Sequence, residues 1–264
     1  MDILYLLLFG VIVGAAGTLI GAGGGFILMP VFLIIYKDKS PAVLTAMSLA
    51  VICANAVSGS IAYGLMKRVD YRAGSFFALA ATPGAIAGAI LIEYIPMDTF
   101  TVMFGLMLVL IAGYLFISAG GAIAGGRADA PTIGPYNLKV GMLMSTVVGF
   151  LSSILGVGGG IIHVPMMVYI LRFPVHFATA TSHFTLAVMT FVATVVHVAA
   201  GDLKDQWLLV MPLAAGVVFG AQAGAKLSPR VRSAYIIRLL ALALILAGVR
   251  AIYQALFQGG GAYR

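Results

Sequence analysis

Residues 21–30 read GAGGGFILMP, and residues 156–165 read GVGGGIIHVP. In both stretches four glycines flank one small apolar residue and lead into an apolar segment that reaches a proline. Glycine has no Cβ, so a run of glycines lets the backbone turn sharply and leaves its amides bare. Because each run lies between strongly apolar segments, the two stretches predict a pair of bends inside a membrane. We call residues 21–25 bend 1 and residues 156–160 bend 2.

The overall composition is typical of a polytopic membrane protein. Hydrophobic residues make up 62% of the chain, charged residues make up 9%, and the mean hydropathy is +1.12. These values exclude an ordinary soluble domain. The net charge of +7 comes from basic residues in short loops between apolar runs, where membrane proteins collect them on the cytoplasmic side. We therefore expect no nucleic-acid partner. The single Cys53 provides neither a disulfide framework nor a metal-ligand spacing.

The segments on either side of bend 1 predict a re-entrant hairpin. Apolar residues run from Ile3 to Ile20 before the bend and from Phe26 to Tyr36 after it. A helix of about 11 residues rises roughly 16 Å, whereas the hydrocarbon core of a bilayer is about 30 Å thick. The second piece is therefore too short to cross. Because the charged residues from Lys37 onward must lie at a surface, we expect the bend near the middle of the membrane.

The other apolar runs are long enough to cross a membrane, and the pattern occurs twice. Full spans are predicted at about residues 42–65, 73–92 and 100–118, and again at about 175–200, 207–227 and 234–257, after a second hairpin over 138–171. We therefore predict a first membrane repeat over residues 1–120, a linker over 121–137 and a second membrane repeat over 138–264. Each repeat would contain one broken-helix hairpin and three transmembrane helices.

The charges of equivalent loops indicate how the repeats are related. The loop after the first full span is basic in repeat one and mostly acidic in repeat two, and the next loop shows the reverse. The residues are Lys67, Arg68 and Arg72 against Asp202, Lys204 and Asp205, then Glu93 and Asp98 against Lys226, Arg230 and Arg232. Basic loops lie in the cytoplasm. The sequence therefore predicts an all-α polytopic membrane protein with two inverted repeats, with eight full spans in parallel repeats as the alternative.

The bends favour an anion as the ligand. The first turn of each short helix, near Phe26 and Ile161, combines unpaired amides with the positive end of the helix dipole. Inverted-repeat transporters bind their substrates near the midplane, between the repeats. We expect a cradle for an oxyanion whose substrate-binding residues are Gly23, Gly24, Gly25 and Phe26 together with Gly158, Gly159, Gly160 and Ile161. The alternative is that the glycines only allow close helix packing.

Polar side chains at a similar depth complete the predicted site. They are Thr45, Ser48 and Asn55 in the first repeat and His163, Thr181, Ser182 and His183 in the second. Hydroxyl, amide and imidazole groups suit the oxygens of an anion, although serine and threonine often bond only to their own helix. Asparagine and histidine are costlier to bury in a membrane, which makes Asn55, His163 and His183 the stronger candidates.

The sequence lacks the residues that several classes of mechanism require. No Asp, Glu, Lys or Arg lies at the centre of a predicted span, which leaves His163 and His183 as the evident proton-linked groups. The sequence has no nucleotide-binding motif and no clear catalytic arrangement, so we expect no cofactor, no metal and no enzymatic activity. Two alternatives remain: an intramembrane enzyme that uses His163, Ser182 and His183, or a structural membrane partner protein.

The bends and two further stretches resemble a known family. Each bend is followed by an apolar helix and a proline, and the next span begins with Thr45-Ala46-Met47-Ser48 or Thr179-Ala180-Thr181-Ser182. This pattern, which covers nearly the whole chain, resembles the sulfite exporter TauE/SafE-like permeases, also called the toluene sulfonate uptake permease family. The resemblance implies a multi-pass transporter of the cell inner membrane or plasma membrane. Its substrates would be small sulfur-containing oxoanions such as sulfite, thiosulfate, sulfoacetate or other organosulfonates. The resemblance does not define the exact substrate, the direction of transport or the coupling ion. It is also compatible with a homo-oligomer.

Overall fold

The computed structural model describes residues 2–124, 132–231, 242, 244–246 and 248–250, and the described part of the chain is helical without any strand. The elements are α1 (Ile3–Ile20), α2 (Gly25–Ile35), α3 (Pro41–Leu65), α4 (Tyr71–Leu91), η1 (Ile92–Tyr94), α5 (Met97–Ala124), α6 (Leu138–Leu155), α7 (Gly160–Pro165), η2 (Met166–Ile170), α8 (Val175–Ala200), α9 (Trp207–Leu227) and η3 (Ser228–Arg230). The span predicted near residues 234–257 lies mostly outside the described residues.

Three of the long helices begin at residues that cap them. Ser40, Asp70 and Asn137 precede α3, α4 and α6, and each side chain accepts a hydrogen bond from the amide three residues further on. Such caps satisfy one of the amides that have no partner within the helix. The predicted starts of these helices therefore agree with the structure to within a few residues.

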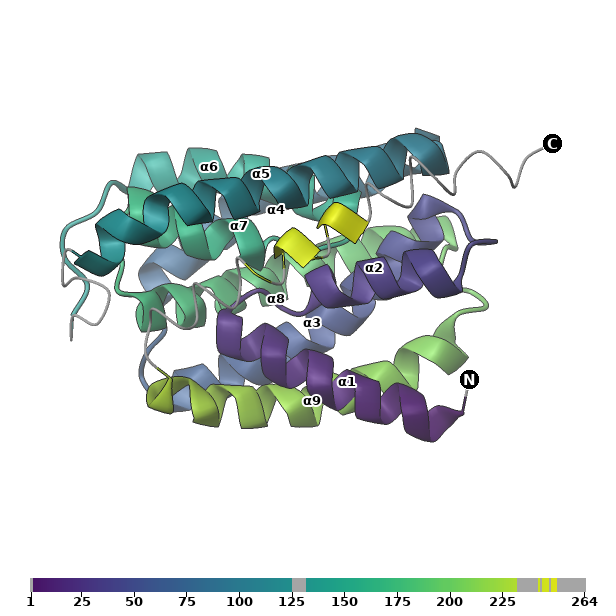
Figure 1. Cartoon of the computed structure of the whole chain (residues 1–264), viewed down its shortest axis with the longest axis horizontal. Helices are drawn as coiled ribbons and strands as arrows, with labels where there is room; N and C mark the ends of the chain where they lie inside the picture. Colours follow the sequence, from purple (N-terminus) through teal and green to yellow (C-terminus); the bar gives the residue numbers. More distant parts are fainter. Residues whose placement is uncertain (1, 125–131, 232–241, 243, 247, 251–264) are drawn as a thin grey trace.

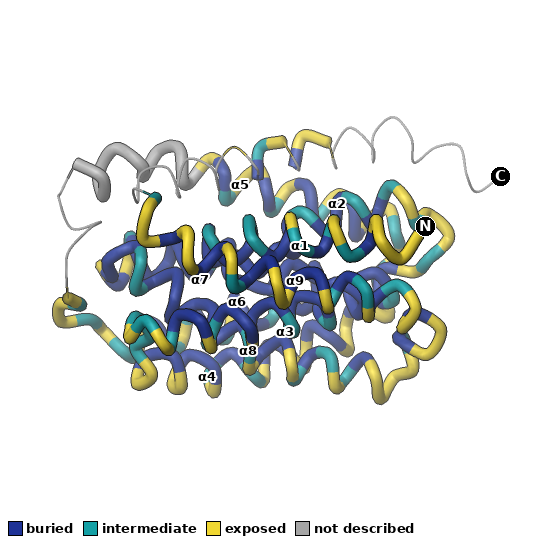
Figure 2. Tube along the Cα trace, turned by 90° about the horizontal axis from the view of Figure 1, so that it is seen from below, coloured by how far each residue is buried: buried dark blue, intermediate teal, exposed yellow. Residues whose placement is uncertain are grey.

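The helices have the length and surface of membrane spans. Six helices between residues 3 and 230 are long and apolar enough to cross a bilayer, while α2, the stretch Met97–Gly113 of α5 and the segment Gly160–Ile170 are shorter. Figure 2 shows buried residues along the interior and exposed residues on the outward faces of the helices. Large apolar side chains such as Leu143, Leu208 and Phe219 are more than half exposed on those faces. A surface of this kind suits lipid rather than water, so the chain is a polytopic membrane protein.

The chain reverses direction at each bend. In Figure 1 the N-terminus and the end of α2 lie at the right-hand end of the molecule, and α3, α4 and α5 then cross from one end to the other. The segment α6–α7–η2 returns to the left-hand end where it began. This return is consistent with the ring contact between Tyr136, just before α6, and Phe173, just after η2, at 4.8 Å. Helices α8 and α9 then cross the molecule in turn.

The main helix pairs join the first half of the chain to the second. Helix α1 packs along α9, and α4 packs along α6. Helices α3 and α8 lie against each other, with α9 also on α3 and α4 also on α8. Small residues bring the backbones close, because a Cβ at Gly14 would meet the backbone of Val217 and one at Gly149 would meet the backbone of Ala81. Close approach of this kind is typical of helix contacts in membranes.

The two ends of the molecule differ in charge. Hydrogen bonds from Tyr136 to Asp70, from Asp70 to Thr181 and between Ser228 and His176 bring the α3–α4 connection, the start of α6, the start of α8 and the end of α9 to one end. That end carries Lys67, Arg68, Arg72, Lys139, Arg172, Lys226 and Arg230, with Asp70 among them. The opposite end carries Asp2, Lys37, Asp38, Lys39, Glu93, Asp98, Asp202, Lys204 and Asp205. We call the first of these the basic end.

The second short helix changes its winding along its length. After bend 2, α7 is regular only as far as Pro165, and the chain continues as the π-helix Met166–Ile170. Proline has no amide hydrogen and its ring crowds the carbonyl four residues earlier, which permits a change of winding but does not require one. The chain after bend 2 is therefore wound differently from α2, which stays α-helical through Pro30 to Ile35.

Candidate functional site

Bend 1 is a left-handed turn between two helices. Gly21 ends α1 with φ of 84°, and Gly24 precedes α2 with φ of 89°, a region that favours glycine. The amides of Ile27 and Leu28 both donate to the Gly24 carbonyl, whereas the amides of Gly24, Gly25 and Phe26 donate to no carbonyl among the described residues. The start of α2 therefore presents free backbone donors at the positive end of a helix.

Bend 2 has the same form. Gly156, Gly158 and Gly159 have φ of 64°, 82° and 67°. The amide of His163 donates to the Gly159 carbonyl, as Leu28 does to Gly24. The amides of Gly158, Gly159 and Ile161 donate to no carbonyl in the described chain, although the Gly160 amide is engaged by the Gly158 carbonyl at 2.8 Å. Phe26 and Ile161 contribute buried apolar side chains beside these amides.

The two bends lie in direct contact. A Cβ at Gly25 would collide with the carbonyl oxygen of Val157 in bend 2, and a Cβ at Gly160 would collide with the carbonyl oxygen of Gly21 in bend 1. The side chain of Ile52 on α3 fills the remaining space, because a Cβ at either Gly23 or Gly158 would meet it. All the bend residues are buried. The glycines therefore also serve close packing, and the free amides lie buried where the bends touch.

One serine joins each bend to the opposite half of the chain. Ser48 on α3 donates to the Gly156 carbonyl at 2.6 Å, and Ser182 on α8 donates to the Gly21 carbonyl at 3.2 Å. Both side chains are fully buried. Buried carbonyls that leave a helix need such partners, because an unsatisfied polar group in an apolar interior is costly. These two predicted site residues therefore lie at the bends.

The predicted threonines are placed differently. The Thr45 hydroxyl donates to the carbonyls of Pro41 and Ala42 in its own helix, and the methyl group and Cα of Thr45 lie beside Gly156. Thr181 faces α4 instead, where its hydroxyl accepts a hydrogen bond from the Asp70 amide at 3.0 Å. The Thr45 hydroxyl thus bonds to its own helix, as such residues often do, whereas the Thr181 hydroxyl bonds to the backbone of another element.

Asn55 and His183 come together in one buried group through a residue that the sequence did not single out. Thr18 on α1 donates to Asn55 Oδ1 at 3.1 Å and lies 3.2 Å from His183 Nε2. Asn55 Nδ2 donates to the Gly23 carbonyl of bend 1 at 3.0 Å. Tyr63 adds a hydrogen bond to the Thr18 carbonyl at 2.8 Å, and its ring meets His183 edge-on at 5.6 Å. Every one of these side chains is fully buried.

His163 belongs to a separate group beside bend 2. Its Nε2 lies 3.0 Å from the Ser145 hydroxyl on α6, and the buried Nδ1 has no hydrogen-bond partner in the described chain. Ser145 donates its own proton to the Gly141 carbonyl at 2.7 Å, so it can only accept from the histidine. His163 therefore carries its proton on Nε2 and directs a bare Nδ1 into the interior.

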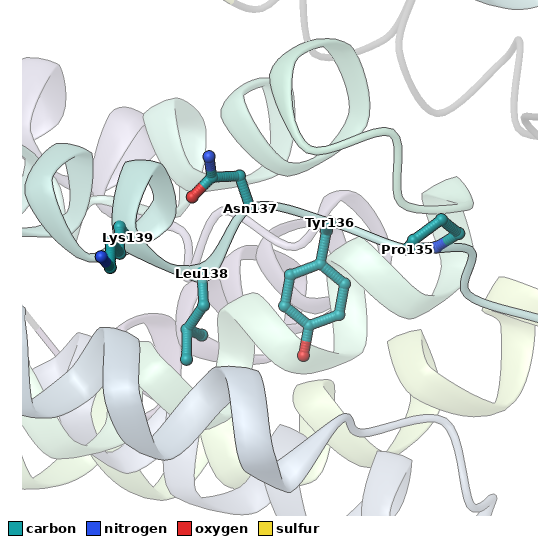
Figure 3. Close-up of a pocket in the computed structure, with 5 residues that line it drawn as sticks. All are labelled: Pro135, Tyr136, Asn137, Leu138 and Lys139. Carbon is teal, nitrogen blue, oxygen red and sulfur yellow. The ribbon is translucent and has the colours of Figure 1, made fainter.

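The chemistry of the arrangement is that of a neutral polar site. Backbone amides, hydroxyls, one carboxamide and two imidazoles surround the bends, and the described residues contain no cluster of His, Cys, Asp or Glu that would hold a metal ion. An open hollow lined by Pro135, Tyr136, Asn137, Leu138 and Lys139 lies instead beside the start of α6 (Figure 3), at the basic end of the molecule. Amides at helix N-termini bind oxyanions without a fixed cation.

Comparison with known proteins identifies similar chains along most of the sequence. The family model described as sulfite exporter TauE/SafE matches residues 6–251. The probable membrane transporter protein YunE of Bacillus subtilis (strain 168) is 32% identical over 97% of this chain and 100% of its own length. A probable membrane transporter protein of Xylella fastidiosa (strain 9a5c) is 30% identical over 84% of this chain and 83% of its own. No solved structure matches the chain.

Proposed function

This chain belongs to the sulfite exporter TauE/SafE family and is a membrane transporter rather than an enzyme, and we propose that it moves small sulfur-containing oxoanions. Sulfite, thiosulfate, sulfoacetate and other organosulfonates share a compact group of oxygens around sulfur. Such a group is suited to several amide and hydroxyl donors that converge from different directions. The bends, with Ser48 and Ser182 beside them, are the proposed binding site.

One observation carries this proposal: two helix N-termini from opposite halves of the chain meet at buried, glycine-lined bends. Free amides are available on both sides, at Gly24, Gly25 and Phe26 in bend 1 and at Gly158, Gly159 and Ile161 in bend 2. Since the bends touch each other, the binding step requires them to move apart. A site that opens and closes between two halves is what alternating access needs.

The two halves of the chain form equivalent helix pairs with each other, which supports an inverted repeat in the proposed architecture. The pair α1–α9 corresponds to the pair α6–α4, and α3–α9 corresponds to α8–α4, when the halves of the chain are exchanged. The hydrogen bonds of Ser48 and Ser182 correspond in the same way. We take residues 1–120 and 138–264 as the two repeats and residues 121–137 as the linker between them.

The proposed orientation places the basic end in the cytoplasm and the chain in the plasma membrane, which is the inner membrane of a cell with two membranes. Short loops rich in Lys and Arg stay on the cytoplasmic side during insertion. The α3–α4 connection and the start of α6 would then face the cytoplasm. The N-terminus, the α2–α3 connection and the α8–α9 connection would face outward.

The test is ligand binding followed by flux. Purified protein should be stabilised against heat by sulfite, thiosulfate or sulfoacetate and not by acetate at the same concentration, with taurine and sulfate as further comparisons. A ligand at 100 times its Kd adds roughly 2.7 kcal/mol to the free energy of unfolding. Proteoliposomes should then transport the stabilising anion. Equal effects of acetate and of all sulfur anions, with no flux of any of them, would reject the proposal.

A further inference from the structure

The hydrogen-bond donors around Thr18 constrain the protonation state of His183. Two backbone carbonyls, those of Gly23 and Thr179, determine how Asn55 is turned and which nitrogen of His183 carries a proton. Asn55 must turn its Nδ2 toward the Gly23 carbonyl, because a carbonyl can only accept, and Asn55 Oδ1 then faces Thr18. His183 Nδ1 lies 3.3 Å from the Thr179 carbonyl and must therefore carry a proton for the same reason. The tautomer of neutral His183 is thus set, with Nε2 as an acceptor.

The single proton of the Thr18 hydroxyl cannot serve both of its neighbours. Asn55 Oδ1 at 3.1 Å needs a donor, and neutral His183 Nε2 at 3.2 Å also needs a donor. With His183 neutral, one of the two contacts has no hydrogen between its heavy atoms, and a buried acceptor stays unsatisfied. With His183 doubly protonated, Nε2–H donates to Thr18, Thr18 donates to Asn55, and Asn55 donates to Gly23. Every contact is then a hydrogen bond.

We propose that His183 is the proton-binding site of this transporter, and that Thr18 and Asn55 are positioning residues that stabilise its doubly protonated form. The four contacts form one chain from the Thr179 carbonyl on α8 to the Gly23 carbonyl in bend 1. Loss of the proton removes one hydrogen bond from this chain. The protonation state of His183 is therefore linked to the hydrogen bond by which Asn55 on α3 holds the Gly23 carbonyl of bend 1.

Few charged groups lie on the elements around this histidine, although Arg68, just after α3, acts electrostatically on the Tyr63 hydroxyl. Helices α1 and α3 contain no charged residue. The only titratable ring described against His183 is that of Tyr63, whose hydroxyl donates to the Thr18 carbonyl. On the other neighbouring helices, α4 has Asp70 and Arg72 at its start and α9 has Lys226 near its end. The Asp70 carboxylate is engaged by Tyr136 and by the Ala73 amide.

His163 is the natural comparison, because its arrangement has the opposite consequence. Its Nε2–H donates to Ser145, and the partnerless Nδ1 is a bare acceptor in the neutral ring. Protonation would create a buried donor for which the described residues offer no acceptor. We therefore expect His163 to stay neutral, with its proton on Nε2, while His183 carries its single proton on Nδ1 and binds a second one as the pH falls.

The inference deepens the proposed function, since a proton held beside bend 1 would offset the charge of an anion bound there. Its test uses the full chain in nanodiscs, without any substrate, and ¹⁵N-histidine NMR, in which the two neutral tautomers and the imidazolium differ in nitrogen shift. The chain has four histidines, so single His→Gln variants assign the signals. A failure to bind sulfur anions would leave a proton site in place, and a failure to bind the proton would leave anion transport in place.

Two threonine variants make the test specific. Thr18→Val removes the acceptor for Nε2–H and should weaken proton binding at His183 by about tenfold or more, a shift of the midpoint of at least about one pH unit. Thr190→Val is the matched control, because this buried hydroxyl donates to the Leu186 carbonyl of its own helix. Asn55→Leu should also lower the midpoint, since the freed Thr18 hydroxyl can then donate to neutral His183.

Three results would overturn the inference. The first is a neutral His183 in the wild type that carries its proton on Nε2. The second is the absence of an imidazolium signal from His183 across the pH range in which the protein stays folded. The third is an equal midpoint in the wild type, Thr18→Val and Thr190→Val. The wild-type spectra need no substitution at the site, so the inference stays testable even if Thr18→Val does not fold.

Discussion

Ser48 and Ser182 make equivalent hydrogen bonds to opposite bends. Ser48 donates to Gly156, 108 residues away, at 2.6 Å, and Ser182 donates to Gly21, 161 residues away, at 3.2 Å. Ser48 lies on α3 and Ser182 lies on α8, and these two long helices pack against each other. The contact between the bends thus depends on both helices, and a change in the packing of α3 against α8 would move the serines relative to the bends.

Replacement of either serine should destabilise the protein. Ser48→Ala and Ser182→Ala each leave a buried carbonyl without its donor, at an expected cost of about 1–3 kcal/mol in the free energy of unfolding. Thermal unfolding in detergent would measure the loss. Thr82→Ala is the control, because its half-buried hydroxyl donates only to the Ala78 carbonyl of its own helix. A loss in the control as large as in the serine variants would contradict the assigned role.

Alanine at the points where the bends touch should prevent their close packing. Gly25→Ala places a methyl group against the Val157 carbonyl, and Gly160→Ala places one against the Gly21 carbonyl. Overpacking of this kind typically costs about 1–3 kcal/mol, so both variants should unfold at lower temperature and lose transport. Gly113→Ala is the matched control, since its Cβ would meet no atom of the described residues within 4 Å. Normal transport by Gly25→Ala would show that the bends need not touch.

The proposed orientation can be tested with single cysteines. In a Cys53→Ala background, a cysteine at position 67 should react with an impermeant reagent only from the cytoplasmic side, and one at position 202 only from outside. Lys67 lies in the α3–α4 connection and Asp202 in the α8–α9 connection, at opposite ends of the molecule. Labelling of both positions from the same side would reject the inverted repeat.

The end of the linker should be held by a hydrogen bond that depends on pH. Tyr136 donates to Asp70 Oδ2 at 3.0 Å, and burial, followed by this hydrogen bond, raises the pKa of Tyr136. Tyr136→Phe should lower the stability by roughly 0.5–1.5 kcal/mol at pH 7. A raised pKa stabilises the fold fully below the unfolded value of about 10, and this contribution is lost as the pH rises through the folded value.

The difference between wild type and Tyr136→Phe should therefore be constant from pH 7 to 9 and shrink above about pH 10. Thermal unfolding at a series of pH values would measure it. Tyr71→Phe is a useful control, because Tyr71 lies beside the same cap and its ring packs on Phe184 at 5.3 Å. A difference that grows with pH would contradict the hydrogen bond to Asp70.

The sequence by itself determined the helices and the bends. Long apolar runs can satisfy their backbone in a membrane only as helices, so the bounds of α6, α8 and α9 follow from the pattern. Glycine runs in an apolar setting likewise predicted two bends, and the structure has left-handed turns there, at Gly21, Gly24 and their counterparts. These features are local, because they depend on neighbouring residues along the chain.

Only the tertiary structure decided which polar groups meet. Thr18 lies in an apolar helix and has no sequence signal, yet it joins Asn55 and His183, which are 37 and 165 residues away from it. Thr181 and Ser182 are adjacent in sequence, but one faces α4 and the other faces bend 1. Neighbours on a helix point about 100° apart, so the packing of the helices fixes the partners of each side chain. The sequence therefore predicted the place of the two bends, and the packing of α1, α3 and α8 decided which side chains lie beside them.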